Sequence, residues 1–192
     1  MFRDSAAQTA GLASALTLAA GEGALQLRTL RTRGVQADRG THTVLAVALT
    51  AALVLALHFP RWAPGLSLAD GAVWPFALGA AVFWAGAALR WWAILTLGRF
   101  FRLTVVVQEG QPVIDRGPYA VLRHPSYAGA LLIYLGAGIA CDNVLSVLVC
   151  LLLPGLAFLR RINVEEALLA RELGEPYRAY ARRTRRLIPG VW

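Results

Sequence analysis

The polar residues best suited to chemistry gather in one loop between apolar segments, over residues 108–127. Five glycines and prolines in or at the end of this loop prevent one continuous helix, so its backbone is expected to fold over a bound molecule. The loop ends with Arg-His-Pro-Ser-Tyr at 123–127, which places an imidazole and a phenol at the start of an apolar segment. An isolated interfacial histidine usually only satisfies a hydrogen bond, but these neighbours favour a binding site.

A second cluster follows the last long apolar run, over residues 160–172. Helical spacing places Arg161 and Glu165, four residues apart, on one face. Taken alone, such a pair is most often a surface ion pair worth roughly 0.2–0.5 kcal/mol. Gly174 and Pro176 then end the helix, and residues 177–186 form a strongly basic segment that suits anionic headgroups.

The composition indicates that the bilayer is the solvent of this chain. Of its 192 residues, 57% are hydrophobic and only 16% are charged, which is too much apolar surface for one water-soluble domain of this size. The net charge is +8, but the arginines are dispersed between apolar runs, so no nucleic-acid partner is expected. Cys141 and Cys150 lie in or beside apolar runs, where cysteine behaves as a small hydrophobe.

Charge-free runs identify the segments that can cross the membrane, since a spanning helix needs about 20 mostly apolar residues. They predict an all-α integral membrane protein, one membrane domain over residues 1–192 with about five transmembrane helices. Only Asp142 and Asn143 separate the last two spans, which therefore form a C-terminal helical hairpin, followed by cytoplasmic C-terminal helices. The predicted spans are residues 6–27, 42–59, 72–97, 126–141 and 144–160.

The arginines predict the orientation of these spans, because cytoplasmic loops carry an excess of positive charge. Four arginines follow the first span, four follow the third and eight follow the fifth, whereas the alternate side carries only Arg3 and Arg61. The N-terminus is therefore expected outside, with the 99–127 loop and the C-terminal tail in the cytoplasm. Both polar clusters then lie on the same face of the membrane.

Two charged residues remain inside the predicted spans, Glu22 and Arg90. At about 1.5 Å of rise per residue they lie at similar depth, toward the cytoplasmic third of the membrane. They are expected to form a structural ion pair or to snorkel separately, and the alternative is a polar wall for a substrate cavity.

The two clusters, in this order, resemble the isoprenylcysteine carboxyl methyltransferase family. The resemblance rests on Arg-His-Pro-Ser-Tyr-Ala-Gly at 123–129, the helical hairpin, Glu165-Glu166, Leu-Gly-Glu-Pro-Tyr-Arg-Ala-Tyr at 173–180 and Leu-Ile-Pro at 187–189. The chain is short and in this resembles prokaryotic members, which implies a prokaryotic plasma membrane. Phospholipid methyltransferases share the general pattern, and some membrane sterol reductases carry a similar His-Pro-x-Tyr segment.

The resemblance implies S-adenosyl-L-methionine as cofactor and a lipophilic or lipidated methyl acceptor. It implies a cofactor-binding region over 108–127 and 160–192, catalytic roles for Arg161 and Glu165, and an Arg161 that faces the acceptor. The cofactor contacts that it implies are Gln108, Gln111, Pro112, Val113, Ile114, Tyr119, His124, Pro125, Ser126, Tyr127 and Glu165.

Other cofactor sites find less support in the residues. No Gly-x-Gly-x-x-Gly follows a strand, so a soluble dinucleotide-type site is not indicated, and no metal site is expected. Gly-Ala-Gly at 136–138 lies inside a predicted span, where close helix packing is the favoured role.

The chemistry of the methyl acceptor stays open at this point. A carboxylate acceptor needs no general base and suits bidentate binding by Arg161, as in isoprenylcysteine O-methylation. An amine acceptor, as in phospholipid N-methylation, must lose a proton and would give His124 or Glu166 a base role. The remaining alternatives are an NADPH-dependent membrane sterol-type reductase and a noncatalytic lipid-binding protein.

Overall fold

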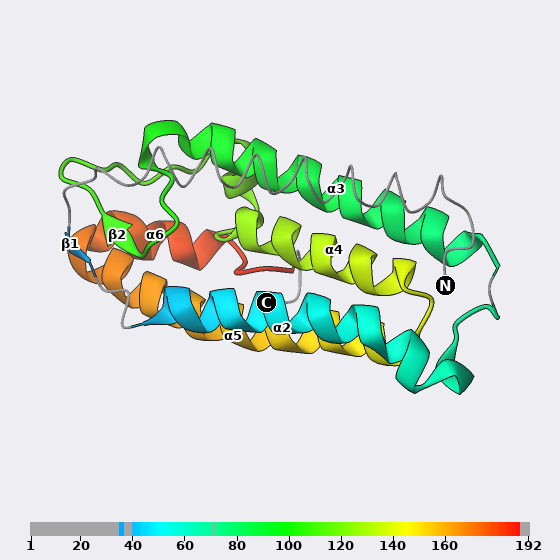
Figure 1. The fold of residues 1–192 in the computed structure, drawn as a ribbon. Helices are drawn as coiled ribbons and strands as arrows, with labels where there is room; N and C mark the ends of the chain where they lie inside the picture. Colours follow the sequence, from blue (N-terminus) through cyan, green and yellow to red (C-terminus); the bar gives the residue numbers. More distant parts are fainter. Residues whose placement is uncertain (1–34, 37–39, 71, 189–192) are drawn as a thin grey trace.

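The computed structural model describes residues 35–36, 40–70 and 72–188. Four long helices lie side by side (Figure 1), with α4 between α3 and the α2–α5 pair. They are α2 (Thr41–Trp62), α3 (Trp74–Leu97), α4 (Pro125–Ala140) and α5 (Val144–Glu172). The predicted span 6–27, and with it Glu22, lies outside the described residues, so the count of five spans and the Glu22–Arg90 pair stay predictions.

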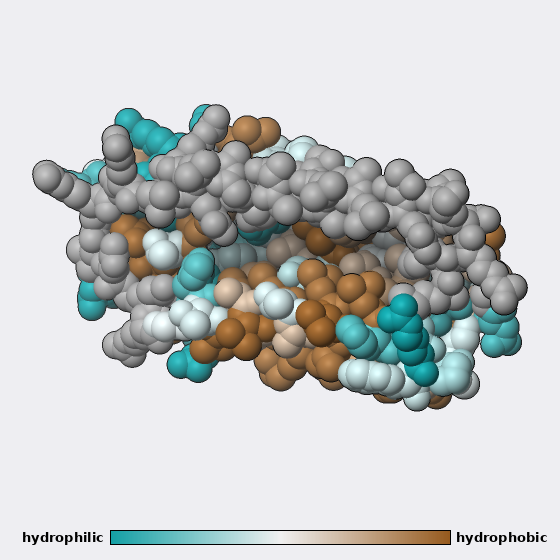
Figure 2. Space-filling model, viewed as in Figure 1, coloured by the Kyte–Doolittle hydropathy of each residue, from teal (hydrophilic) through white to brown (hydrophobic). Residues whose placement is uncertain are grey.

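The described helices agree with an integral membrane protein. By length and composition α2, α3 and α5 can each cross a bilayer, and α4 is a shorter apolar helix. Large apolar side chains such as Val47, Leu95 and Leu156 are more than 60% exposed, as lipid-facing residues would be. Figure 2 shows apolar side chains over the middle of the visible face.

The helix bounds follow the predicted spans closely except at the end of α5. This helix continues twelve residues beyond the predicted end of the span at 160, because glycine and proline are absent until Gly174. Gly174 has a positive φ of 62°, and Pro176 lies in the first turn of the next helix, α6 (Glu175–Arg183). The predicted break therefore falls between α5 and α6.

Glycines allow α3 and α4 to approach each other closely. A Cβ added to Gly136 would lie 2.5 Å from the Gly79 carbonyl oxygen, and one added to Gly86 would lie 2.6 Å from that of Gly129. Gly138 faces α5 in the same way, with the Ser146 carbonyl oxygen 2.8 Å from an added Cβ. The packing role predicted for the glycines at 136–138 is confirmed.

Polar side chains join α2 to α5. The Ser146 hydroxyl donates to the Ala56 carbonyl (2.7 Å), and the Asn143 amide donates to the Ala63 carbonyl (2.9 Å). Asn143 also caps α5, because its side-chain oxygen accepts from the backbone N–H of Leu145 at 3.0 Å. Interhelical hydrogen bonds of this kind stabilise helix pairs where no water competes.

Short irregular segments complete the fold near the polar end of the bundle. A two-stranded antiparallel ribbon, which the sequence did not predict, pairs β1 (Val35–Gln36) with β2 (Val106–Val107). The short 3-10 helix η3 (Gly117–Ala120) precedes α4. The C-terminal tail returns to this loop, where Arg185 forms a parallel bridge with Leu122.

We predict that Gly136→Ala destabilises the protein, since the added methyl group meets the backbone of α3. Overpacking of this kind costs about 1–3 kcal/mol, which lowers the thermal midpoint in detergent by several degrees. Gly155→Ala is the matched control, because an added Cβ there meets no atom within 4 Å. A Gly136→Ala midpoint at or above that of Gly155→Ala would contradict the close approach of the helices.

Candidate active site

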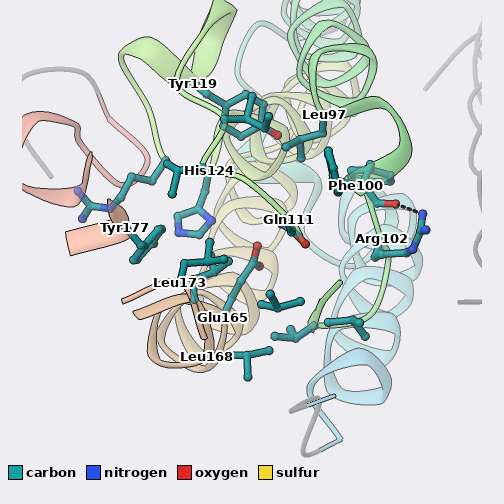
Figure 3. A pocket seen from close by; sticks show the side chains of 18 of the residues that line it. Leu97, Phe100, Arg102, Gln111, Tyr119, His124, Glu165, Leu168, Leu173 and Tyr177 are labelled. Atoms are coloured by element: carbon teal, nitrogen blue, oxygen red, sulfur yellow. Dashed lines mark hydrogen bonds between the residues drawn. The ribbon is translucent and has the colours of Figure 1, made fainter. Parts of the chain in front are cut away.

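A pocket opens where the 97–127 segment, the second half of α5 and α6 meet (Figure 3). Figure 3 shows Tyr177 and His124 on one side and Arg102 on the other, with Glu165 and Gln111 between them. The wall combines aromatic rings, aliphatic side chains and a few polar groups, as small-molecule sites do. Glu165 of α5 and several polar residues of the 108–127 loop therefore border one pocket.

Most of the predicted cofactor contacts lie in this wall. They come from the loop before η3, from η3 and the start of α4, and from α5. They are Gln111, Pro112, Val113, Ile114, Tyr119, His124, Ser126, Tyr127 and Glu165. Their roles toward a cofactor stay predictions.

Two further predicted contacts, Gln108 and Pro125, lie behind the wall. The Gln108 side chain donates to the Arg99 carbonyl (3.1 Å) and accepts from Arg102 (3.1 Å). Its backbone N–H donates to the Gln111 side chain (3.0 Å). Pro125 is buried in the first turn of α4, where proline is favoured. Both residues shape the loop without bordering the pocket.

Arg161 also lies outside the pocket wall, contrary to the expectation that it faces an acceptor there. It is 2% exposed, its Nε donates to the Tyr127 hydroxyl (2.8 Å), and its guanidinium donates to the Leu103 carbonyl. The Tyr127 hydroxyl in turn donates to Glu165 (2.6 Å). Arg161 lies one helical turn before Glu165, about 6 Å along α5 and deeper in the bundle. Its contact with the pocket is therefore indirect, through the Tyr127 hydroxyl.

A stack of rings fixes this phenol in place. The Tyr127 ring lies between Phe158, at 4.9 Å and 25°, and His124, at 5.5 Å and 5°, measured between centroids and ring planes. Aromatic pairs at these separations stabilise beyond their buried area. The imidazole that borders the pocket is therefore held parallel to the Tyr127 ring.

Arg90 on α3 supports the start of α4. Its Nη1 donates to the Ser126 hydroxyl (2.9 Å) and to the Ser126 carbonyl (3.3 Å). Arg90 is buried and does not line the pocket, whereas Ser126 does. The alternative in which Arg90 forms a cavity wall is wrong for this pocket.

Glu166 gathers three nitrogen donors beside the pocket. Its carboxylate lies 2.7 Å from Arg123 Nε, 2.9 Å from an Arg186 nitrogen and 3.2 Å from His124 Nε2. The Glu166 side chain does not line the pocket. This carboxylate therefore links the loop, α5 and the tail.

The tyrosines outside the membrane helices keep their protons. Burial, followed by the charge of Glu165, raises the pKa of Tyr119, and burial raises the pKa of Tyr180 to about 12. Burial, followed by the charges of Glu166 and Glu165, also raises the pKa of Tyr177. All three phenols line the pocket and can donate a hydrogen bond at neutral pH.

Residues 78–171 match the isoprenylcysteine carboxyl methyltransferase (ICMT) family. This stretch, 94 of the 192 residues, belongs to that family. The matched residues begin within α3 and end next to the last residue of α5, and they contain every residue named singly above as catalytic or as a cofactor contact. α6 and the tail lie outside the match.

Several curated relatives are eukaryotic proteins named as methyltransferases. Protein-S-isoprenylcysteine O-methyltransferase B of Arabidopsis thaliana is 31% identical over 120 residues, 62% of this chain and 61% of that protein. Protein-S-isoprenylcysteine O-methyltransferase of Schizosaccharomyces pombe is 32% identical over 109 residues, 50% of this chain and 46% of that protein. The chain thus spans about half to three fifths of the length of these curated relatives.

A solved family structure shares the fold. The eukaryotic intramembrane Ras methyltransferase ICMT is similar with a TM-score of 0.64 and 28% sequence identity. The similarity covers 76% of this chain and 52% of that chain. It agrees with the helical membrane architecture described above.

Several pocket residues were not named singly from the sequence, although those from Leu168 onward lie within the predicted 160–192 region. The aliphatic residues Leu168, Leu169 and Leu173 recur at helical spacing after Glu165, a signal that the sequence offered. Tyr177 and Tyr180 belong to the quoted 173–180 motif, but only the fold shows that α6 folds back onto the pocket. The others are Leu97, Phe100, Phe101, Arg102, Thr104, Val105, Val106, Val107 and Arg123.

We predict that Glu166→Ala strongly destabilises the protein, because it leaves the Arg123, Arg186 and His124 nitrogens without their shared carboxylate. Leaving the partners of this partly buried carboxylate unpaired costs about 1–3 kcal/mol, which is measurable as a lower thermal midpoint in detergent. Glu172→Ala is the control, since its partner Arg171 is exposed and such pairs are worth about 1 kcal/mol or less. Equal midpoints for the two variants would contradict a linking role for Glu166.

Proposed function

We propose that this protein is an S-adenosyl-L-methionine-dependent methyltransferase that esterifies the carboxylate of an isoprenylcysteine-like lipophilic acceptor. Membership of the ICMT family and the names of the relatives support the reaction class. The observation that carries the proposal is that Glu165, His124 and Tyr127 border one pocket beside apolar helices. Such a pocket suits a polar cofactor on one side and a lipid chain on the other.

The residues of the pocket fit this cofactor. Glu165 is half-buried and accepts from Tyr127 through one of its oxygens, and a carboxylate can accept further bonds from ribose hydroxyls or an ammonium group. The tyrosine rings and the loop carbonyls suit a heterocyclic base and a sulfonium cation. Gln111, Val113 and Ile114 line the pocket from the loop, which agrees with a backbone that folds over the ligand.

The mechanism needs positioning more than acid–base chemistry. S-adenosylmethionine supplies a methyl group already activated as a sulfonium, so a carboxylate acceptor needs no general base. The chain must align the methyl group with the acceptor carboxylate and exclude water. Alignment of this kind accounts for large rate effects. Tyr127 holds Glu165 in place, and Arg161 fixes Tyr127 from behind. We therefore propose Glu165 as a cofactor-binding catalytic residue and Arg161 as a positioning residue.

The pocket wall also contains apolar side chains, among them Phe100, Leu168 and Leu169, which suit an isoprenyl chain or another hydrocarbon tail of the acceptor. We place the pocket on the cytoplasmic face of a prokaryotic plasma membrane, with the N-terminus outside. The excess of arginines in the loop and tail supports this orientation.

The test is methyl transfer from labelled S-adenosylmethionine to N-acetyl-S-farnesylcysteine by the full-length protein in lipid. Glu165→Gln removes the charge that binds the cofactor, and we expect kcat/KM to fall by about 100-fold or more. Glu175→Gln, at an exposed carboxylate of α6, is the control that retains turnover. Full activity of Glu165→Gln would contradict the assignment of the site.

The nature of the product separates the alternatives. A methyl ester releases its label as methanol in mild alkali, whereas an N-methylated phospholipid retains it. Label that resists alkali and extracts with phospholipid would establish the amine acceptor. Binding of NADPH without binding of S-adenosylhomocysteine would instead favour the reductase.

A further inference from the structure

The hydroxyl of Tyr177 is a buried polar group without a hydrogen-bond partner among the residues that the structure describes. The Tyr177 side chain is 5% exposed and lines the pocket from the first turns of α6. Buried polar atoms in folded proteins are nearly always paired, and an orphaned one calls for an explanation. A polar atom of a ligand bound in the pocket would supply the missing hydrogen-bond partner.

The surroundings of Tyr177 define the kind of partner. Figure 3 shows Tyr177 next to His124, with Glu165 toward the middle of the pocket. The Glu166 carboxylate nearby is already bound by Arg123, Arg186 and His124. Glu165 is the carboxylate that borders the pocket. A ligand group beside both Tyr177 and Glu165 should therefore carry N–H or O–H hydrogens.

Tyr180 provides an internal comparison. It lies three residues further along α6, lines the same pocket and is 4% exposed, with its ring centroid 6.0 Å from that of Tyr177. Its hydroxyl, however, donates to the Tyr119 carbonyl (2.8 Å) and lies 3.3 Å from the Leu122 carbonyl. The Tyr180 hydroxyl stabilises the fold, whereas the Tyr177 hydroxyl contributes no such bond among the described residues.

We propose that the Tyr177 hydroxyl binds the cofactor, by a hydrogen bond to an N–H or O–H group that lies beside Glu165. This inference rests on the proposed function. Two parts of the cofactor carry such hydrogens, the nucleoside and the amino-acid chain. The phenol can serve either, because it both donates and accepts.

The test compares Tyr177→Phe with Tyr180→Phe in the detergent-solubilised full chain. Without ligand, Tyr177→Phe should keep or raise the thermal midpoint, because it removes an unpaired buried hydroxyl, while Tyr180→Phe lowers the midpoint by several degrees. By calorimetry, S-adenosylhomocysteine should bind Tyr177→Phe about 5- to 10-fold more weakly than the wild type, the effect of one hydrogen bond.

A second probe, 5′-methylthioadenosine, has the nucleoside but lacks the amino-acid chain. Equal loss of affinity for both probes places the Tyr177 contact on the nucleoside, and loss for S-adenosylhomocysteine alone places it on the amino-acid chain. Unchanged binding of both probes overturns this inference alone, as does a midpoint that falls as far as in Tyr180→Phe. Absence of S-adenosylhomocysteine binding by the wild type overturns the proposed function as well.

Discussion

The Tyr127 hydroxyl is the point on which the geometry of the pocket depends. It accepts from the buried Arg161 and donates to Glu165, so one phenol joins a cation inside the bundle to a carboxylate in the pocket wall. A buried guanidinium is costly unless it is hydrogen-bonded, and this requirement fixes Tyr127 at the start of α4 against α5. The ring stack of Phe158, Tyr127 and His124 extends the same constraint to the imidazole.

The hairpin and the loop depend on contacts that join distant parts of the chain. Glu166 on α5 binds Arg123 before α4 and Arg186 after α6, and the backbone of Arg185 pairs with that of Val121 at 3.0 Å. The tail therefore reinforces the loop that carries His124. In a membrane protein of this size, these polar contacts outside the apolar helices hold the pocket residues in register.

Much of this architecture could be predicted from the sequence, because charge-free runs mark helices and helical spacing assigns residues to faces. The same reasoning placed Arg161 and Glu165 on one face but gave no depth, so it did not show that Tyr127 separates Arg161 from the pocket. The ribbon of β1 and β2 joins two-residue segments about 70 residues apart, too short for a periodic pattern. The orphaned hydroxyl of Tyr177 becomes visible only once α6 is placed.

The glycine contacts between α3 and α4 also limit how this chain can diverge. A Cβ on Gly79 meets the backbone of Gly136 at 2.5 Å, and a Cβ on Gly136 meets that of Gly79 at the same distance. A substitution at either position has no compensating change at the other, since no residue is smaller than glycine. A larger residue at either glycine would have to separate α3 from α4, and that separation would draw Ser126 away from Arg90. The evolutionary freedom of the pocket therefore lies in α5, α6 and the loop.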